Sequence, residues 1–403
     1  MSLARLPDDV VIAGNSRIFL LVLDGLGGIQ HPRFNKTELQ AARKPNLDRL
    51  ARESMCGVLD PVMPGITPGS GPSHMALFGY DPLECNIGRG ILSALGVDFE
   101  LTENDLAARA NFATVDAKGN VVDRRAGRIS SEVNSKLCEK LGRSVKLPYG
   151  AKLFIQTESE HRAVVIFRGE GLLGDISDTD PQMVGVPPKE PAPLNPEAKK
   201  GSDIVRSFLT QASEILKDEH PANAILLRGF AMQKPFRSFY DRFKLKAAAV
   251  AKYPMYRGLA RLIHMEVLPA CEDMDAEIDL VRTKLQNFDF FYIHVKKTDS
   301  YGEDGNFEEK VKTIEQVDSK IPSLLALSPD VVVVTADHST PSVMKAHSWH
   351  PVPVLLCAKT CRVDDVVSFD EISCAKGGIG RMPMVHLMNL ILAHAGRLTK
   401  YGA

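Results

Sequence analysis

Histidine and aspartate residues gather in one short stretch of the chain. Residues 335–353, TADHSTPSVMKAHSWHPVP, hold Asp337 and three of the eleven histidines, which are His338, His347 and His350. Carboxylate oxygens and imidazole nitrogens are a donor mixture that suits Mn²⁺ or Zn²⁺. The stretch follows the apolar run PDVVVV, and one aspartate after a strand is commonly only a turn or cap residue. A metal site therefore needs ligands from elsewhere in the chain.

Two other apolar runs also end in an aspartate. RIFLLVLDGLGG carries Asp24 and FDFFYIHVKKTDSYG carries Asp299. Such runs predict buried strands, and helical periodicity at residues 46–54 and 317–327 indicates that helices alternate with them. This alternation predicts an α/β doubly wound sheet, in which ligands bind at the carboxyl ends of the strands. We therefore predict a metal site there, with five ligands: Asp24, Asp299, Asp337, His338 and His347.

A serine lies in a turn rich in small residues. GITPGSGPSHMALFGYDP, residues 65–82, contains Ser70, and a helix is expected to begin near Ser73. A hydroxyl beside a metal ion can act as a nucleophile, and the free N–H groups of a helix start favour phosphate. Taken alone the segment is an ordinary Gly/Pro/Ser loop. Together with the metal ligands it indicates a nucleophile.

Arginines supply a means of binding an anion. DRRAGR, residues 123–128, is rich in arginine, NIGRG contains Arg89, and LLRGF places Arg228 after an apolar strand. Guanidinium groups bind phosphate or carboxylate in a bidentate manner, although a solvated basic loop is the alternative for residues 123–128. Metal ions, a serine nucleophile and these arginines together indicate phosphoryl transfer through a phosphoserine.

The length, charge and cysteine content of the chain limit the kinds of protein that it can be. Its 403 residues favour two domains, and a net charge of -1 gives no general attraction to nucleic acid or to an anionic membrane. Seven cysteines without a CxxC pair suit a reducing compartment. No apolar run approaches the ~20 residues that span a bilayer, and the start of the chain lacks a signal-peptide profile. We expect a cytoplasmic protein that binds neither nucleic acid nor membrane, whereas the oligomeric state is left open.

The middle of the chain has a different pattern. Residues 100–245 contain alternating segments, a hairpin signal in VDAKGNVV and a proline-rich connector at 184–196. We expect these residues to form an inserted α+β domain that binds substrate. The metal-binding core domain would then comprise residues 1–99 and 246–403.

Most of the chain resembles a known family, the cofactor-independent (2,3-bisphosphoglycerate-independent) phosphoglycerate mutases of the archaeal type, within the alkaline phosphatase superfamily. The motifs that carry the resemblance are VLDGLGG, TPGSGPSHMALFGYDP, GRGILSALGVDFEL, ARANFATVD, DRRAGRI, DISDTDP, KKTDSYGEDGN, TADHSTP and HSWHPVPVLL. The resemblance implies an alkaline phosphatase-like doubly wound sheet with an inserted domain. It also implies interconversion of 3-phosphoglycerate and 2-phosphoglycerate, a step of glycolysis and gluconeogenesis, with a small phosphorylated substrate as partner.

The resemblance also implies roles for individual residues. Ser70 would be the phosphorylated nucleophile. Two divalent metal ions would be bound, one by Asp24, Ser70, Asp337 and His338, the other by Asp299, Glu303 and His347. Substrate would be bound by His74, Arg89, Asp123, Arg124, Arg125, Arg128, Arg228 and Arg257. His350 is expected to be a neighbour of the ligands and not one of them.

The sequence departs from the family at one ligand. The residue four after Asp299 is commonly histidine, and here it is Glu303, with Asp304 as a rival ligand. Harder oxygen ligands favour Mn²⁺ or Mg²⁺ over Zn²⁺, so Mn²⁺ is the expected ion. Two alternative functions stay open: a metal-dependent phosphatase or phosphotransferase acting on another small phosphorylated metabolite, for example in homoserine phosphorylation, and a non-enzymatic metal-binding regulator.

Overall fold

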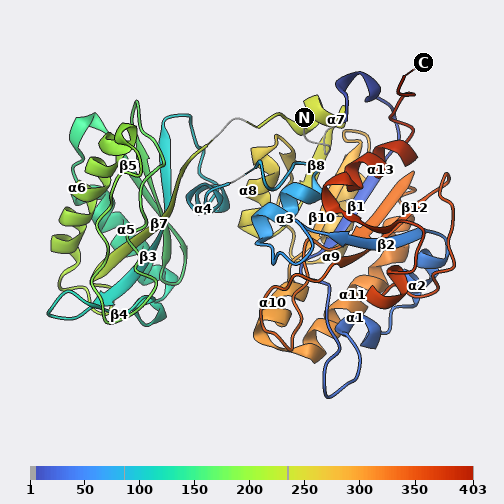
Figure 1. Ribbon diagram of the computed structural model, residues 1–403, viewed down its shortest axis with the longest axis horizontal. Coiled ribbons are helices and arrows are strands. Elements are labelled where there is room, and N and C mark those ends of the chain that lie inside the picture. Colours follow the sequence, from blue (N-terminus) through green and yellow to red (C-terminus); the bar gives the residue numbers. More distant parts are fainter. Residues whose placement is uncertain (1–5, 86, 234–235, 403) are drawn as a thin grey trace. The chain divides into compact units, whose positions relative to one another are not determined.

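The chain folds into two compact units. The computed structural model describes residues 6–85, 87–233 and 236–402. One unit, here called the sheet unit, comprises Met1–Asn86 and Arg237–Ala403, and the other, the inserted unit, comprises Ile87–Phe236 (Figure 1).

An eight-stranded mixed sheet forms the centre of the sheet unit. Its strand order is β13-β2-β12-β11-β1-β10-β8-β9. The strands are β1 (Ile18–Leu23), β2 (Met55–Asp60), β8 (Ala247–Val250), β9 (Glu266–Val267), β10 (Phe290–Val295), β11 (Val331–Thr335), β12 (Val352–Ala358) and β13 (Gly380–Pro383). Every residue of β1 and β11 is buried, as their continuous apolar sequences predict.

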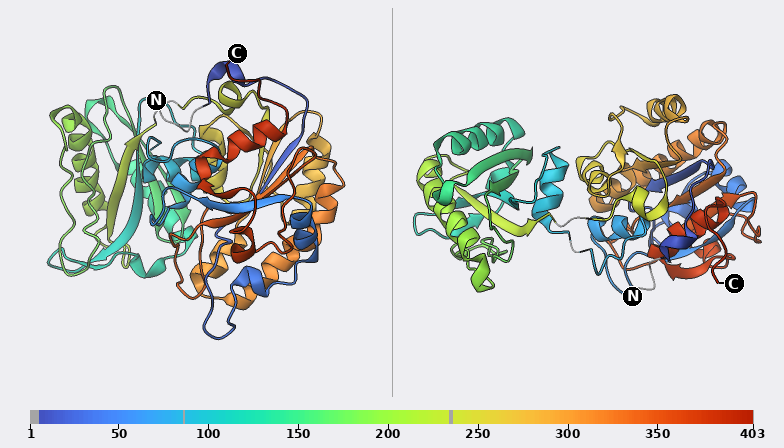
Figure 2. Two further views of the ribbon diagram at one scale, coloured as in Figure 1. Left: turned by 45° about the vertical axis from the view of Figure 1, so that its right-hand side comes forward. Right: turned by 90° about the horizontal axis from the view of Figure 1, so that it is seen from above.

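Helices cover both faces of this sheet, which confirms the predicted α/β doubly wound class (Figures 1 and 2). They are α1 (Glu38–Ala41), α2 (Pro45–Arg52), α3 (Ser70–Leu77), α7 (Phe239–Phe243), α8 (Pro254–Leu262), α9 (Met274–Lys284), α10 (Lys297–Asp304), α11 (Phe307–Leu325), α12 (Glu371–Cys374) and α13 (Leu387–His394). Short 3-10 turns lie at Asp8–Val10 and Met384–His386. The helical periodicity at residues 46–54 and 317–327 corresponds to α2 and α11.

The strand directions bring the predicted site residues to one edge of the sheet. β1 is parallel to both β10 and β11, so the residues after these three strands emerge at the same edge. β12 is antiparallel to β11, which keeps the connecting residues 336–351 at that edge. β2 is antiparallel to β12, so the segment leading from β2 into α3 also starts there.

The inserted unit combines an antiparallel sheet with helices, the α+β arrangement that was expected. Its strands are β3 (Asp105–Val115), β4 (Val121–Asp123), β5 (Lys152–Ser159), β6 (Arg162–Arg168) and β7 (Ala224–Met232). The order is β4-β3-β6-β5, and β7 pairs with β3. Its helices are α4 (Arg89–Gly96), α5 (Ser131–Ser144) and α6 (Lys199–Leu216), with 3-10 turns at Ala126–Arg128, Pro148–Gly150 and Pro196–Ala198. The expected hairpin is present, since Val115 pairs with Val121.

The two faces of the inserted sheet differ. Phe112 of β3 packs in one apolar core with Leu141 of α5 and Phe208 of α6, whereas α4 packs against β3 and β7 on the other side (Figure 1). Side chains alternate along a strand, so one set of residues in β3 and β7 faces α5 and α6 and the other set faces away from them.

The division between the units differs from the expected boundaries at 99/100 and 245/246. Helix α4 belongs to the inserted unit because it packs on the sheet of that unit. Helix α7 belongs to the sheet unit because Phe239 packs against Phe290 of β10, with ring centroids 5.0 Å apart. Across the described residues, no helix is both long and apolar enough to cross a membrane.

Candidate functional site

Asp24, Asp337 and His338 form one group of potential metal ligands. All three are fully buried, and one ligand atom from each lies within 4.8 Å of the others. His338 Nε2 is 3.4 Å from Asp24 Oδ1 and 3.1 Å from Asp337 Oδ2. Asp24 Oδ1 is buried without a hydrogen-bond partner, which is rare for a carboxylate oxygen. This donor set therefore fits a divalent cation.

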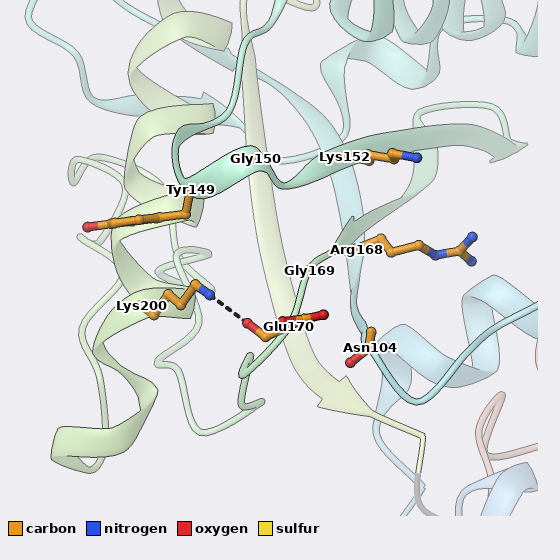
Figure 3. Close-up of a pocket in the computed structure, with 8 residues that line it drawn as sticks. All are labelled: Asn104, Tyr149, Gly150, Lys152, Arg168, Gly169, Glu170 and Lys200. Atoms are coloured by element: carbon orange, nitrogen blue, oxygen red, sulfur yellow. Dashed lines mark hydrogen bonds between the residues drawn. The ribbon is translucent and has the colours of Figure 1, made fainter.

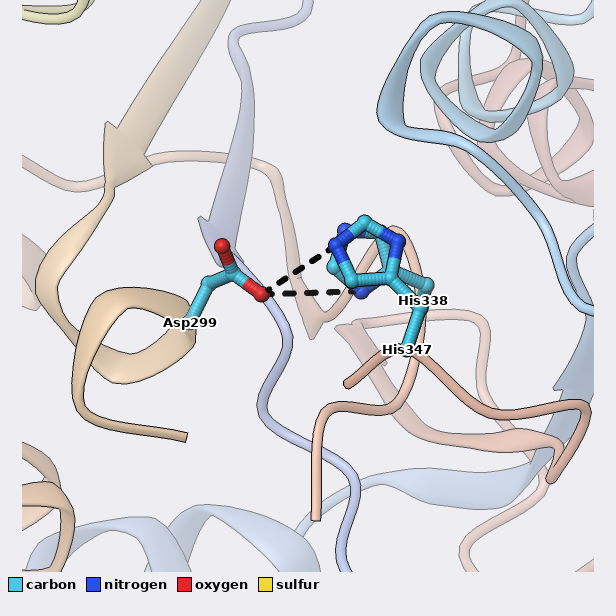
Figure 4. A group of neighbouring side chains, drawn as sticks. All are labelled: Asp299, His338 and His347. Atoms are coloured by element: carbon cyan, nitrogen blue, oxygen red, sulfur yellow. Dashed lines mark ion pairs between the residues drawn. The ribbon is translucent and has the colours of Figure 1, made fainter. Parts of the chain in front are cut away.

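A second group contains Asp299, His338 and His347 (Figure 4). His347 Nε2 is 3.6 Å from Asp299 Oδ1, and the two histidine rings stack with centroids 3.7 Å apart. His347 Nδ1 lies 3.0 Å from the carbonyl oxygen of Pro68. Because a carbonyl only accepts, this nitrogen carries the proton, and the lone pair of Nε2 points toward Asp299.

The hydrogen bonds of Thr340 determine to which of the two ligand groups His338 offers its lone pair. Its hydroxyl donates to Asp299 Oδ1 at 2.6 Å and also lies 3.0 Å from His338 Nδ1. The single hydroxyl proton is used on Asp299, so we assign the proton between Thr340 and His338 to Nδ1 of the histidine. His338 Nε2 then carries the free lone pair, and it faces Asp24 and Asp337. Asp299 and His347 form a separate, incomplete ligand set.

The ionisation of these groups suits a metal. Burial raises the pKa of Asp24, but the hydrogen bond from His294 and the charge of Lys296 outweigh it and hold the pKa well below its usual value. Burial lowers the pKa of His338 despite the nearby charges of Asp337 and Asp24. Carboxylates and neutral imidazoles are the forms that bind metal ions.

Glu303 lies in helix α10, although the residue before it is Gly302 and glycine is typical of loops. Asp299 and Glu303 are four residues apart in that helix, so they share a face. Glu303 Oε1 is 3.8 Å from His347 Nε2, and its side chain is 55% exposed. Burial and the charge of Asp299 raise its pKa. Asp304, the rival ligand, is exposed one position further round the helix.

Ser70 is the first residue of α3, so the helix begins three residues before the expected start at Ser73. Its Oγ lies 3.3 Å from His338 Nε2, which brings the hydroxyl to the first ligand group. Ser73 is fully buried, and its Oγ lies 3.1 Å from the carbonyl oxygen of Gly69 and 3.3 Å from Asp337 Oδ2. Ser70 is therefore the better-placed nucleophile of the two serines.

Two buried histidines hold the aspartates. His74 is fully buried, with Nδ1 3.0 Å from Ser70 O and 3.1 Å from Asp337 Oδ2. This location behind Asp337 argues against the expected contact of His74 with substrate, because no part of its ring is exposed. His294 Nε2 lies 3.2 Å from Asp24 Oδ2. The sequence reasoning did not select His294, which points back from β10 toward the site.

Lys296 is a site residue that the sequence reasoning missed. Its ammonium lies 3.2 Å from Asp24 Oδ2 and 2.5 Å from Asp299 Oδ2. Burial lowers the pKa of Lys296, but the charges of the two aspartates outweigh it and hold the pKa above its usual value. Its position three residues before Asp299 at the start of a helix was the signal in the sequence. The site thus contains a permanent cation of its own.

The inserted unit brings several arginines together. Arg109 in β3 is in register with Arg228, which lies within β7 and not after a strand as expected. Arg228 Nε is buried without a hydrogen-bond partner. Burial and the charges of Arg109 and Arg89 lower the pKa of the Arg228 guanidinium. Positive charge gathered in this way favours a carboxylate or phosphate ligand. Arg109 was not selected from the sequence.

Of the other predicted substrate residues, Arg124 and its partner Asp180 lie near enough for their charges to act on Arg228. Arg124 forms a bidentate pair with Asp180 at 2.9 and 2.7 Å. Asp123 accepts from the backbone of residues 125 and 127, which makes it a turn residue and argues against the expected contact with substrate. Arg125 and Arg128 are exposed. Arg257 lies in α8 of the sheet unit and donates to the carbonyls of Ala251 and Leu268 at 3.1 and 2.8 Å.

His350 belongs to neither ligand group within the described residues. Its Nδ1 lies 3.0 Å from Ser348 Oγ, and its ring stacks on Trp349. The expectation that His350 is a neighbour and not a ligand agrees with this placement.

A surface cavity of the inserted unit is separate from the arginine group (Figure 3). It is lined by Asn104, Tyr149, Gly150, Lys152, Arg168, Gly169, Glu170 and Lys200. Asp105 binds Arg168 through two hydrogen bonds of 2.7 Å, and the Lys200 ammonium donates to the carbonyl of Glu170 at 2.6 Å. In Figure 3 the Lys152 and Arg168 side chains point away from Tyr149 and Lys200, so the cations do not converge.

Comparison with known proteins identifies the family. The family model described as 2,3-bisphosphoglycerate-independent phosphoglycerate mutase matches residues 51–223. A probable enzyme of that name from Thermosipho africanus is 51% identical over 399 residues, covering 99% of each chain. One from Thermus thermophilus is 49% identical over 391 residues, covering 96% of each.

Solved structures agree with this relationship. A cofactor-independent phosphoglycerate mutase from Thermoplasma acidophilum has a TM-score of 0.75 and 31% identity, covering 94% of this chain and 100% of that one. A protein from Pyrococcus horikoshii has a TM-score of 0.82 and 29% identity, covering 96% and 100%. The chain therefore belongs to the family of 2,3-bisphosphoglycerate-independent phosphoglycerate mutases.

Proposed function

We propose that this protein is an isomerase that interconverts 3-phosphoglycerate and 2-phosphoglycerate through a phosphoserine at Ser70. The observation that carries the proposal is the position of the Ser70 hydroxyl, 3.3 Å from His338 Nε2, beside the ligand group of Asp24, Asp337 and His338. The family relationship supplies the substrate.

Two divalent cations would be held at the sheet edge. Asp24, Asp337 and His338, with the Ser70 hydroxyl, would bind one, while Asp299 and His347 would bind the other with Glu303 as a further ligand. When bound, the cations neutralise phosphoryl oxygens and lower the pKa of the serine hydroxyl. The mixture of carboxylate and imidazole ligands favours Mn²⁺, with Mg²⁺ or Zn²⁺ as the alternatives.

The chain's own residues then account for the transfer. Ser70 Oγ loses its proton and attacks the phosphorus, the bond from phosphorus to the oxygen on carbon 3 breaks, and that oxygen takes up one proton in exchange. The hydroxyl on carbon 2 then loses its proton and attacks the phosphorus, the bond to Ser70 Oγ breaks, and Oγ takes up a proton again. The first N–H groups of α3 favour the phosphoryl oxygens, and Lys296 offers a fixed positive charge between Asp24 and Asp299.

The arginine group of the inserted unit is proposed to bind the substrate. Arg228, Arg109 and Arg89 lie close enough for their charges to depress the pKa of the Arg228 guanidinium, and Arg228 Nε is buried without a partner. A carboxylate or phosphate would supply that partner and relieve the repulsion. Phosphoglycerate carries both groups.

The test uses the full chain, loaded with Mn²⁺ and given 3-phosphoglycerate, with products followed by proton and phosphorus NMR. We expect 2-phosphoglycerate to form without free phosphate. Glycerate and free phosphate would instead identify a phosphatase, and an unchanged substrate would contradict both activities.

Ser70→Ala is expected to abolish turnover, with a loss of at least about a thousandfold, because no other group accepts the phosphoryl moiety. The variant should keep its far-ultraviolet circular dichroism and bind metal with at most modestly reduced affinity. Acid quenching of the wild-type reaction followed by tandem mass spectrometry should find phosphate on Ser70. Ser73→Ala is the matched control, and near-normal turnover in Ser70→Ala would move the nucleophile elsewhere.

A further inference from the structure

Lys310 is a fully buried lysine in helix α11. Its ammonium donates to three backbone carbonyls, those of Gly25 at 2.9 Å, Thr340 at 2.8 Å and Gly27 at 3.4 Å. Lysine is almost never fully buried unless it is paired, because removing its charge from water is costly. Three donors and three acceptors match, so the ammonium is fully used inside the protein.

The three carbonyls belong to the two segments that carry the metal ligands. Gly25 directly follows Asp24, and Thr340 is two residues after His338. The backbone N–H of Thr340 also reaches the carbonyls of Gly25 and Gly27, at 3.2 and 3.0 Å. Lys310 therefore joins segments that are more than 300 residues apart in the chain, at the place where they approach each other.

Two glutamates, one buried and one half-buried, offset the charge of Lys310 and bind the same segments. Glu38 is 1% exposed, and its Oε1 accepts from the backbone N–H of Ser342 at 2.8 Å. Glu371 accepts from the N–H of Gly28 and from the Thr37 hydroxyl, both at 2.8 Å. Among the charges acting on Lys310, those of Glu38 and Glu371 are the strongest, ahead of Asp299 and Asp24. The positive charge of Lys310 is thus offset mainly by Glu38 and Glu371, which are not predicted metal ligands.

We propose that Lys310 is a positioning residue whose ammonium holds the segments after β1 and β11 at the separation that the metal site between Asp24, Asp337 and His338 requires. This inference rests on the proposed two-metal function. Lys310 touches neither the substrate nor the ligand side chains, so it acts only through the backbone next to them.

Positioning and simple charge repulsion predict opposite results. If Lys310 affected the site only through its charge, its removal would strengthen the binding of a cation. If it served only the stability of the fold, a variant that still folds would bind metal like the wild type. If it positions the ligands, its removal weakens metal binding, and neighbours that orient metal ligands typically change affinity 10- to 100-fold.

The experiment compares Lys310→Met with Lys312→Met in the full chain. Lys312 is two positions along the same helix, exposed, and paired with Glu309, so it is a matched control. Metal is removed with a chelator, Mn²⁺ is added back, and free Mn²⁺ is followed by electron paramagnetic resonance. We expect Lys310→Met to bind Mn²⁺ at least about tenfold more weakly, and its kcat to fall while KM for 3-phosphoglycerate changes less than about twofold. Lys312→Met should match the wild type.

Lys310→Gln provides a second route to the same test, because it removes the charge while its amide N–H groups can still donate to the backbone carbonyls. If circular dichroism shows that Lys310→Met does not fold, the second variant is measured in its place. A smaller loss of Mn²⁺ affinity is then expected. Unchanged or tighter Mn²⁺ binding in the folded variants would overturn the positioning role alone. A wild-type chain that binds no Mn²⁺ would overturn the proposed function and this inference with it.

Discussion

At the scale of single residues, the site depends on where protons lie on its two histidines. Thr340 fixes Nδ1 of His338 as a donor, and the Pro68 carbonyl does the same for Nδ1 of His347. Each imidazole therefore offers Nε2, His338 to Asp24 and Asp337 and His347 to Asp299. The result is two separate ligand sets. Among the described residues, the second set then consists of Asp299 and His347 and needs a further ligand.

Glu303 is the residue best placed to complete that second set. Glu303→Gln should weaken the binding of one of two Mn²⁺ ions by about ten- to a hundredfold, because it removes an anionic oxygen near His347. The stoichiometry and affinity can be measured by calorimetric titration of the metal-free chain. Asp304→Asn is the control, since Asp304 is exposed at the next helix position. Two unchanged binding events in Glu303→Gln would place Glu303 among the solvated acids of α10.

At the scale of elements, the approach of α10 to the segment after β11 sets the position of Asp299. The approach is possible because α10 has a glycine at the contact: a Cβ at Gly302 would lie 2.3 Å from the carbonyl oxygen of Thr340. Thr340 in turn holds Asp299 and His338 through its hydroxyl. The short helix therefore presents Asp299 to the site only while position 302 has no side chain.

Gly302→Ala should destabilise the protein by about 1–3 kcal/mol, the usual effect of overpacking a filled interior, in spite of the better helix propensity of alanine. It should also lower Mn²⁺ affinity, since the helix that carries Asp299 must move. Urea unfolding and Mn²⁺ titration measure the two effects. Gly142→Ala in α5 is the matched control: its Cβ would meet only Ile155, at 3.6 Å, so a gain of up to about 1 kcal/mol is expected. Equal effects at both positions would contradict the role of the contact.

At the scale of the whole molecule, the predicted functions are divided between the two units. The predicted metal ligands and Ser70 belong to the sheet unit, and the group of Arg89, Arg109 and Arg228 belongs to the inserted unit. Metal binding and substrate binding should therefore respond to different substitutions.

Arg228→Ala should raise KM for 3-phosphoglycerate by about ten- to a hundredfold, as expected for the loss of one or two hydrogen bonds to a charged group. The metal content, measured by elemental analysis, should stay at the wild-type value because Arg228 is not in the sheet unit. Arg143→Ala removes an exposed arginine of the inserted unit that pairs with Glu139, and it should change neither quantity. A wild-type KM in Arg228→Ala would contradict the role of Arg228 and leave the other arginines of the inserted unit as candidates for binding the anion.

Much of the chemistry could be predicted from the sequence because its signals are local. The apolar runs before Asp24, Asp299 and Asp337 predict buried strands. In a doubly wound sheet the residues that follow such strands lie at one edge, where ligands bind. Helix starts were harder to predict, as Ser70 shows: it is the first residue of α3, whereas the helix was expected to begin near Ser73. Local composition cannot reveal that a glycine is needed for packing instead of for a turn.

Only the tertiary structure decided which buried polar groups support the site. His294 and Arg109 look unremarkable because each is a single polar residue in an apolar strand. Lys296 and Lys310 look unremarkable because they lie among other charged residues, in KKTD and FEEKVK. Their roles come from partners in distant parts of the chain, such as the pairing of Lys310 with the carbonyls of Gly25 and Thr340. The reverse holds for His74, which its sequence position favoured as a substrate ligand and which burial places behind Asp337. Contacts of this kind depend on how strands are ordered and paired in the sheet, and no local pattern encodes that order.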